Sequence, residues 1–343
     1  MRHRLCGFLP AVATLVFLSV PAAKANLVLN ATGIADGFSV TTFASGLPSS
    51  GGAFALGPFG TTVVSNGTGG FNVLVEDYAN ATLYVFNDVD GQTPGSALLT
   101  RPFGPTANGF ATLNGVAYGG NGFTYGSFSN TGVFTPFSIA GLPQPLWGLA
   151  ADSVTGELIA STFGGGLIAI NPTANTFRTI NASLASVDGV SVSPDGQTVY
   201  VEVSGGVRAY NVHTGALIQT LAAPGGSYAP DGTGVISSSN FLNGQVIIND
   251  NFGNLYLADP VAHTITLIGS NTNQRGDYTS PDFSNGTLLL VYSDQIERLS
   301  CGIGCAIGST PPPSSVPEPS SVLLIGTGLA GLIAAFVRRK SVL

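Results

Sequence analysis

Between Asn26 and Gly302, apolar residues alternate with polar residues in short runs, and no helical periodicity persists beyond a turn or two. The runs are rich in Val, Ile, Leu and Tyr and are bounded by Gly, Asn, Asp and Pro, a pattern typical of short antiparallel strands joined by tight turns. Three pairs of runs predict hairpins: LYVFN with ALLT, VSVS with TVYVEV, and VIIND with LYLAD. This part of the chain is therefore predicted to be all-β.

The same order of strands and turns recurs along the chain. Three units, which contain WGLAAD, DGVSVSPD and PDGTGV, each predict an inner strand, two middle strands and an outer strand. Their matching glycines are Gly148, Gly189 and Gly232, which are 41 and 43 residues apart. That period is typical of one four-stranded blade of a β-propeller.

Weaker units begin near Gly52 and Gly115, and a truncated unit runs from Tyr278. The count predicts a six-bladed β-propeller, and the long interval between Gly52 and Gly115 leaves seven blades open as an alternative. The last unit lacks an outer strand, which the N-terminal segment 38–43 can supply. Closing the ring in this way removes an open sheet edge that would otherwise promote aggregation.

The first 25 residues are predicted to be a cleaved signal peptide. Arg2 and Arg4 precede an apolar run, and the small residues Ala23 and Ala25 flank Lys24 at the expected cleavage site. This order of a basic segment, an apolar segment and a small-residue site is typical of exported proteins. A short membrane anchor is the alternative.

The other end of the chain predicts a transmembrane helix. Residues 320–337 are 18 residues without charge, which as a helix span about 27 Å, close to the thickness of a bilayer core. Pro317 and Pro319 set its start, because proline does not fit a helix interior. Arg338, Arg339 and Lys340 follow directly and are predicted to stay cytoplasmic.

The tripeptide Pro317-Glu318-Pro319, the apolar helix and the pair Arg338-Arg339 occur in an order that resembles the PEP-CTERM sorting signal. The segment is also known as an ice-binding protein C-terminal domain, a name that is not evidence of ice binding. The resemblance implies recognition by an exosortase, a membrane protease that handles exported proteins of Gram-negative bacteria. It further implies transient anchoring in the inner membrane, followed by display on the cell surface or in the extracellular matrix.

The body of the chain is acidic. Residues 26–316 contain five Arg, no Lys and 17 Asp or Glu, a net charge of −12. Such a surface is repelled by phosphate backbones, which argues against binding of nucleic acid. Without lysine, Schiff-base chemistry and a P-loop are excluded as well.

The mature body has two cysteines, Cys301 and Cys305, which an exported protein can join as a disulfide; free thiols and metal ligation are the alternatives. The following segment is rich in Pro and Ser and predicts a stiff spacer. The predicted organisation is a signal peptide over 1–25, a propeller over 26–302, a linker over 303–316 and a sorting signal over 317–343.

The stretches SPDGQTVYV and FGNLYLAD resemble repeats of NHL, YVTN and gluconolactonase-like propellers. Gluconolactonase-like enzymes bind a divalent cation on the propeller axis with Glu, Asn and Asp ligands. The resemblance places Asp188 at the Asn position and Asp231 at the Asp position, whereas Ser49 and Ser50 stand where the Glu is expected. Both Asp residues should lie near one end of the axis without a nearby Lys or Arg, and they are weak candidates for Ca²⁺ binding or plain turn formers.

No catalytic residue is predicted. His213 and His263 fall in turns before outer strands, away from the axis, and no G-x-S-x-G, H-E-x-x-H or paired C-x-x-C motif occurs. The Asp88–Gly91 segment has only part of a calcium-loop pattern and predicts a solvated turn. No cofactor is expected, apart from weak Ca²⁺ binding.

These features predict an exported, exosortase-sorted propeller of the cell surface or extracellular matrix with a binding or structural role. Its expected partners are the exosortase, the membrane through the C-terminal helix, and a surface glycan or protein. The alternative is a metal-dependent hydrolase, similar to a lactonase, with an axial cation.

Overall fold

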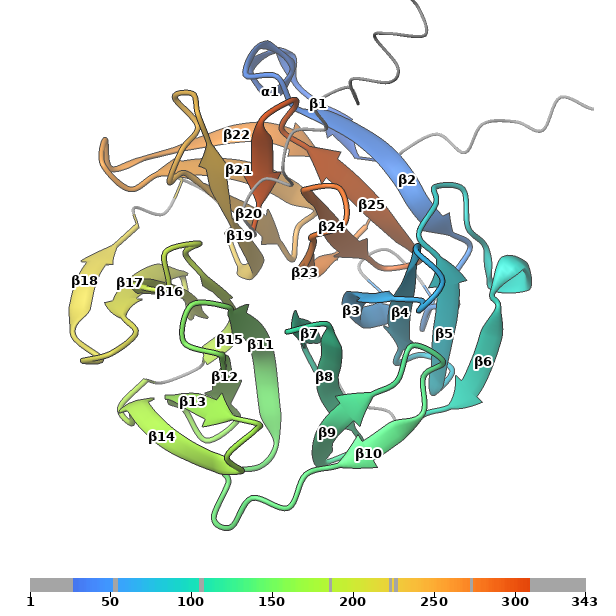
Figure 1. The fold of residues 1–343 in the computed structure, drawn as a ribbon. Coiled ribbons are helices and arrows are strands. Elements are labelled where there is room, and N and C mark those ends of the chain that lie inside the picture. Colours follow the sequence, from blue (N-terminus) through green and yellow to red (C-terminus); the bar gives the residue numbers. More distant parts are fainter. Residues whose placement is uncertain are drawn as a thin grey trace, which may run out of the picture.

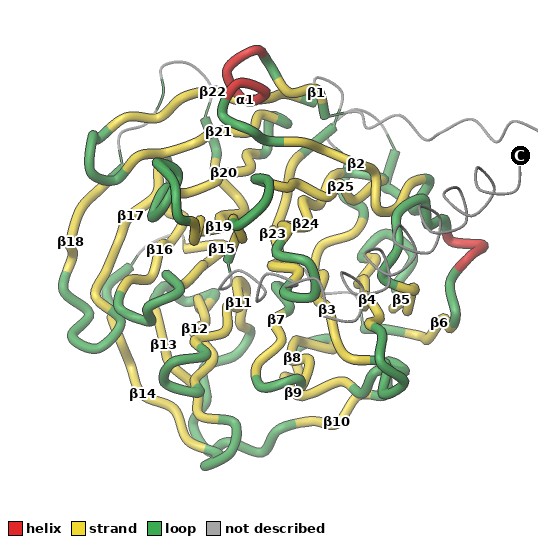
Figure 2. Tube along the Cα trace, turned by 45° about the horizontal axis from the view of Figure 1, so that its top comes forward, coloured by secondary structure: helices red, strands yellow, loops and turns green. Residues whose placement is uncertain are grey.

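The alternating apolar runs form strands that assemble into six antiparallel sheets around one central axis (Figure 1). A computed structural model describes residues 27–51, 55–104, 108–184, 187–221, 224, 228–271 and 274–308. The tilted view shows the innermost strands around the axis and the outermost strands on the rim (Figure 2). The described part of the chain is therefore a six-bladed β-propeller.

Four strands make up each of the first three blades, in order from the axis outward. Blade one contains β3 (Pro58–Ser65), β4 (Phe71–Asp77), β5 (Thr82–Asn87) and β6 (Leu99–Pro102), with a short 3-10 helix (Pro94–Ser96) before β6. Blade two contains β7 (Ala111–Leu113), β8 (Val116–Asn121), β9 (Thr124–Phe128) and β10 (Phe134–Pro136). Blade three contains β11 (Leu146–Asp152), β12 (Glu157–Thr162), β13 (Leu167–Asn171) and β14 (Thr176–Asn181).

The last three blades follow the same plan with additions. Blade four contains β15 (Val187–Val192), β16 (Thr198–Val203), β17 (Gly206–Asn211) and β18 (Leu217–Thr220). Blade five contains β19 (Pro230–Ser238), β20 (Val246–Asp250), β21 (Asn254–Asp259) and β22 (Thr264–Ser270), extended by β1 (Val28–Leu29) outside and β26 (Cys305–Ile307) inside. Blade six contains β23 (Gly276–Asp282), β24 (Thr287–Tyr292), β25 (Gln295–Ser300) and β2 (Ser39–Ser45), which α1 (Ala31–Ala35) precedes.

The N-terminal strand closes the ring, as predicted. β2 pairs antiparallel with β25, with Ser39 opposite Ser300 and Ser45 opposite Gln295 (Figure 1). Phe43 is fully buried, so the strand also contributes to the core. Because the first segment completes the last blade, the edge of β25 is covered and the ring closes non-covalently.

Six blades are confirmed for the described residues, and the seven-blade alternative is wrong. The long interval in the first unit comes from the loop between β5 and β6, which contains the 3-10 helix. The unit expected near Gly115 was misplaced, since Gly115 lies in the turn after β7 with φ +78°; Gly52 lies outside the described residues. The glycines that correspond to Gly148 are Gly60, within β3, and Gly109, just before β7, since each packs closely against the backbone of the next blade.

The matching glycines have a packing reason. A Cβ atom on Gly148 would lie 2.6 Å from the carbonyl oxygen of Asp188 in the next blade, and one on Gly232 would lie 2.6 Å from that of Asp277. Such a contact is shorter than any side chain tolerates, so neighbouring inner strands approach each other through backbone alone. Glycine at this position therefore allows the inner strands of neighbouring blades to pack closely around the axis.

Many of the acidic residues form turns. One carboxylate oxygen of Asp152 accepts hydrogen bonds from the backbone N–H groups of Val154 (2.9 Å) and Thr155 (3.2 Å). Asp250 accepts in the same way from Phe252 and Asn254. These Asx turns account for part of the acidic composition without any functional role.

The segment after β25 returns to the axis. A disulfide joins Cys301 and Cys305, and β26 then pairs with β19, with Cys305 opposite Ser238 and Ile307 opposite Ile236. The backbone N–H of Gly308 donates to the carbonyl oxygen of Val235. The linker was expected from residue 303, but the folded body continues to Gly308 because β26 supplies backbone partners to the inner edge of β19.

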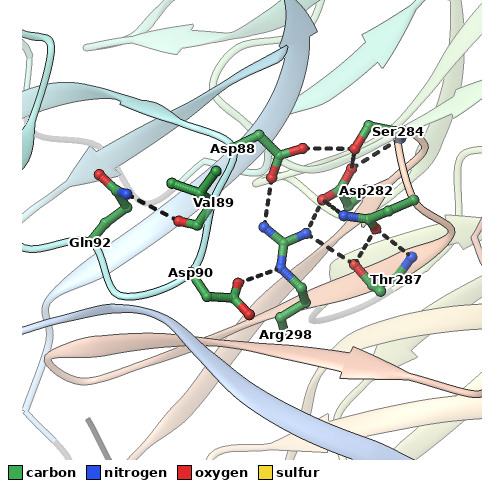
Figure 3. A network of polar contacts seen from close by, with 9 residues as sticks. Asp88, Val89, Asp90, Gln92, Asp282, Ser284, Thr287 and Arg298 are labelled. Atoms are coloured by element: carbon green, nitrogen blue, oxygen red, sulfur yellow. Dashed lines mark hydrogen bonds and ion pairs between the residues drawn. The ribbon is translucent and has the colours of Figure 1, made fainter. Parts of the chain in front are cut away.

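A buried arginine ties blade six to blade one at the closure point (Figure 3). The Arg298 guanidinium contacts Asp88 (2.6 Å), Asp90 (2.8 Å) and the fully buried Asp282, and it lies 5.2 Å from the centroid of the Phe43 ring. The turn expected over Asp88–Gly91 is exposed at Val89, Asp90 and Gly91, but the Asp88 side chain is only 7% exposed. This loop of blade one is part of the ring closure.

No helix in the described ranges is long and apolar enough to cross a membrane. The predicted signal peptide, with Ala23 and Ala25, and the predicted sorting helix over 320–337 both lie outside the described residues.

Candidate functional site

The face at which the inner strands begin is called the upper face here, and the face at which they end is the lower face. The six inner strands are β3, β7, β11, β15, β19 and β23. Because the second strand of each blade is antiparallel, it ends at the upper face; Pro58 pairs with Asp77 and Pro230 with Asp250, for example. The turns between second and third strands therefore also lie on the upper face.

Six equivalent residues surround the axis at this face. A β-bulge interrupts the start of the inner strand in every blade except blade two. In the five bulged blades the residue at the bulge stands before the close-packed glycine, or before Tyr278 in blade six, and Asn108 holds the same place in blade two. The six residues are Phe59, Asn108, Trp147, Asp188, Asp231 and Asp277. Bulges turn side chains out of the regular alternation, and in blades four to six the three Asp side chains interact with one another.

Tyr278 takes the place of the glycine in blade six. Its side chain is 4% exposed, and its hydroxyl donates a hydrogen bond of 2.7 Å to a carboxylate oxygen of Asp188 in blade four. The ring packs 6.2 Å from that of Phe59 in blade one. A single side chain thus links three blades at the upper end of the axis.

Arg275 lies beside the same acids. Its guanidinium contacts Asp231 at 2.7 Å and Asp277 at 3.0 Å, and its Nε donates to the side-chain oxygen of Asn251. The expectation that Asp188 and Asp231 have no nearby Lys or Arg was wrong. Asp188 and Asp231 do come together at one end of the axis, within hydrogen-bonding reach of each other, but a cation of the protein accompanies them.

Asp188, Asp231, Asp277 and Glu202 form what we call the acidic cluster, and burial is the main cause of their pKa shifts. It raises the pKa of Asp188 to about 6, although the hydrogen bond from Tyr278 and the charge of Arg275 oppose the shift. It raises the pKa of Asp277 to about 7, and Arg275 opposes that shift too. Burial, together with the neighbouring acids, holds the pKa of Asp231 and of the fully buried Glu202 well above the usual range. Each of these carboxyls is therefore protonated more readily than an exposed one.

The acidic cluster does not fit a divalent cation. The guanidinium of Arg275 and the hydroxyl of Tyr278 already occupy oxygens of Asp231, Asp277 and Asp188. Among the described residues, no group of three or more His, Cys, Asp or Glu side chains is arranged to hold a metal ion. Ser50, at the place expected for a Glu, accepts a hydrogen bond from the backbone of Leu56 in its own loop.

Sequence reasoning missed Glu202, Arg275, Asp277 and Tyr278. Aligning Asp277-Tyr278 with the Asp-Gly pairs of the preceding blades would have found two of them. Arg275 and Glu202 carry no such signal, because one lies in the loop before its inner strand and the other in the second strand of its blade.

Exposed aromatic side chains also lie in turns of the upper face. The rings of Trp147 and Phe163 lie 5.3 Å apart, and Phe163 is 66% exposed. Phe123 is 74% exposed and Phe252 43% exposed, each in the turn between the second and third strands of its blade. Of these, the Trp147–Phe163 pair gives blade three a paired aromatic surface on the upper face.

The two histidines lie in turns. The backbone N–H of His213 donates to the Asn211 side chain in the turn between β17 and β18, and His263 has φ +56° in the turn between β21 and β22. Both turns are at the lower face, away from the acidic cluster.

Comparison with known proteins agrees with the sequence at the C-terminus. Residues 315–340 match the PEP-CTERM protein-sorting motif. The chain carries a PEP-CTERM sorting motif. The matched range includes Pro317, Glu318, Pro319, Arg338 and Arg339. The PEP-CTERM motif implies an exported protein that an exosortase sorts to the cell surface. No curated protein matches this chain.

The propeller resembles several solved structures. A gluconolactonase from Xanthomonas campestris has 14% identity and a TM-score of 0.58, covering 82% of this chain and 96% of that protein. A putative gluconolactonase has 15% identity and a TM-score of 0.55, covering 80% and 97%. Virginiamycin B lyase from Staphylococcus aureus has 12% identity and a TM-score of 0.51, covering 77% and 99%. At these identities the likeness shows the fold alone.

Proposed function

We propose that this protein is a non-enzymatic binding protein of the cell surface or extracellular matrix, which holds a neutral glycan on its upper face. In this proposal residues 1–25 direct export and are removed after Ala25. The helix over 320–337 then holds the protein in the inner membrane of a Gram-negative cell until the exosortase acts at the Pro317–Pro319 tripeptide. The observation that carries the binding role is the set of exposed aromatic rings in the turns of the upper face.

Aromatic rings suit sugars because a hexose ring presents an apolar C–H face together with hydroxyls at its edge. Phe163 and Phe123 offer flat apolar surfaces, at 66% and 74% exposure, on the turns of neighbouring blades. Trp147 supports Phe163 from below and has an indole N–H to donate. A chain of sugar units lying across blades two and three would contact all three rings.

Charge favours a neutral partner. The body has a net charge of −12 and no Lys, so it repels acidic polysaccharides and phosphate groups at long range. Arg275 does not offset this, because its guanidinium is occupied by Asp231 and Asp277.

The chain leaves the propeller on its lower side, which supports a role for the upper face in binding. Gly308 lies beside the lower half of β19, and the proposed membrane helix begins at residue 320. The 11 residues between them reach about 40 Å at most when extended. A protein held by this motif therefore has its lower face on the side of the anchor and its upper face free for a partner.

The occupied acids weigh against the alternative of a metal-dependent hydrolase. A catalytic cation needs carboxylate oxygens that are free to bind it, whereas here Arg275 and Tyr278 bond to them. We therefore propose that calcium is at most a weak ligand of Asp188 and Asp231. A calcium-dependent lactone hydrolysis that is lost in Asp188→Asn would overturn the non-enzymatic proposal.

The binding proposal is tested on an array of neutral and acidic glycans with the full-length protein in detergent. We expect neutral hexose oligomers to be retained and acidic ones not. Phe163→Ala and Phe123→Ala should each weaken the binding at least fivefold, since each removes a stacking surface. Phe241→Ala is the matched control, because Phe241 is also 66% exposed but lies in the turn between β19 and β20 on the lower face. Equal loss in Phe241→Ala and Phe163→Ala, or no retained neutral glycan, contradicts the proposal.

A further inference from the structure

A cavity lies in the lower half of the propeller axis, away from the aromatic rings of the upper face. It has a volume of about 270 Å³, and the inner strands of blades two to six contribute to its wall. Its mouth reaches the lower face, where Asn114, Gly115 and Ser153 are exposed in the turns after β7 and β11. At the upper end, Tyr278 and Asp188 cross the axis, so the cavity and the acidic cluster are at opposite ends.

The lining is polar but uncharged. Six hydroxyl side chains line it, and no Asp, Glu, Lys, Arg or His is among its lining residues; the hydroxyls are those of Ser153 at the mouth and of Thr112, Ser191, Thr233, Thr279 and Ser280. Apolar contacts come from Leu149, Val190 and Phe283. A site of this kind selects a neutral ligand that has both hydroxyls and C–H surface, since an ion would be desolvated there without a counter-charge.

Several of the hydroxyls are held in place by one another. The side chains of Ser191 and Thr233 are 2.7 Å apart, and the Thr279 hydroxyl donates to the Thr233 carbonyl oxygen at 2.6 Å. Each of these hydroxyl oxygens retains a lone pair for a further bond. The cavity is thus lined by pre-positioned groups, which lowers the entropy cost of binding.

Ser280 is the group that most needs a partner. Its side chain is 2% exposed, and within the described ranges its hydroxyl has no hydrogen-bond partner. A buried hydroxyl without a partner costs about 1–3 kcal/mol. Ser280 lines the cavity, but its hydroxyl oxygen is itself buried, so the side chain has to rotate about χ1 to bond a hydroxylated ligand there. Such a bond would remove that cost.

The strand edges add donors and acceptors. β7, β11, β15 and β23 are the terminal strands of their sheets, so their axial edges do not pair with a further strand. Only β19 differs, because β26 covers the lower part of its edge. Backbone N–H and C=O groups of four inner strands therefore line the axis together with the hydroxyls.

We propose that this lower cavity binds one neutral, polyhydroxylated molecule of hexose size, such as a monosaccharide or a cyclic polyol. The volume lies just below the range of pockets for drug-sized ligands, which fits a single six-carbon ring and excludes an oligosaccharide. The site is independent of the glycan-binding face, because no residue is shared between them.

The test is isothermal titration of the full-length protein in detergent with glucose, galactose, mannose and myo-inositol, and with gluconate as the acidic counterpart. We expect saturable one-to-one binding of at least one neutral compound and none of gluconate. Ser280→Ala should weaken that binding about five- to tenfold, the loss of one hydrogen bond, without lowering the melting temperature. Thr279→Val is a second variant on the same wall and should weaken binding to a similar extent.

The upper-face variant Phe163→Ala serves as the control for independence. Binding of the small polyol should be unchanged in Phe163→Ala, while binding of the glycan chain should be unchanged in Ser280→Ala. The lower-cavity proposal is overturned if no neutral compound binds, if gluconate binds equally well, or if the affinity in Ser280→Ala and Thr279→Val equals that of the unmodified protein. Each of these results leaves the glycan proposal standing.

Discussion

The hydroxyl of Tyr278 donates a 2.7 Å hydrogen bond to Asp188 across the propeller axis, from blade six to blade four. The bond exists because blade six has a tyrosine where the other blades have a close-packed glycine. The bond therefore links two blades, four and six, that are not adjacent in the ring. The same hydroxyl occupies a carboxylate oxygen of Asp188 that a bound cation would need.

Replacing Tyr278 with Phe tests this link. We expect Tyr278→Phe to lower the free energy of unfolding by about 1–2 kcal/mol, because the buried Asp188 loses a donor. The pKa of Asp188 should rise further, since the tyrosine hydrogen bond lowers it. Urea denaturation and NMR titration of the Asp188 carboxyl measure the two effects. Tyr78→Phe, at a partly exposed ring on the same face, is the control and should change neither.

The protein should be more stable at pH 5 than at pH 8. Folding raises the pKa of Asp188 and of Asp77 to about 6 and that of Asp277 to about 7, from about 3.8. Between about pH 4 and 7 the folded state thus binds more protons than the unfolded state, so stability falls as pH rises through this window. Denaturation at constant ionic strength measures the slope. Asp277→Asn should flatten it, and an unchanged slope would exclude Asp277 as a source.

Arg298, at the ring closure, should contribute more to the free energy of unfolding than the half-exposed Arg178. In Arg298→Met the buried Asp282 and Asp88 lose their cation, a change that costs about 3–5 kcal/mol. Arg178→Met is the control, because its guanidinium is 36% exposed beside Glu157, and we expect a loss of at most about 1 kcal/mol. Chemical denaturation compares the two. Adding Asp282→Asn to Arg298→Met should recover part of the loss, and equal losses in the two single variants would argue against the closure role.

The sorting motif should depend on Glu318. In a host that has an exosortase, we expect Glu318→Ala to remain unprocessed in the membrane fraction, while the unmodified protein reaches the surface. Immunoblots of fractionated cells measure the distribution. Asp259→Ala, which alters an exposed turn of the body, is the control and should be processed normally. Normal processing of Glu318→Ala would remove the assignment of this residue.

Local patterns alone were sufficient for much of the fold. The alternation of apolar residues gave the strands, and Gly148, Gly189 and Gly232 marked three inner strands correctly, because close backbone packing admits no other residue there. The first two blades were misplaced, since a long loop between β5 and β6 breaks the period on which the comparison of repeats depends.

The sequence by itself determined the sorting motif and the strand pattern, since both depend on residues close together in the chain. The strand pattern follows from the alternating apolar runs and the spaced glycines. Only the tertiary structure decided the chemistry of the axis. Asp188, Asp231, Arg275 and Tyr278 come from three blades, and their contacts depend on how the ring closes. The hydroxyl-lined cavity depends on it equally, because inner strands far apart in the chain bring Thr112, Ser191 and Ser280 to one wall. The spacing of these residues along the sequence does not predict that they lie close together.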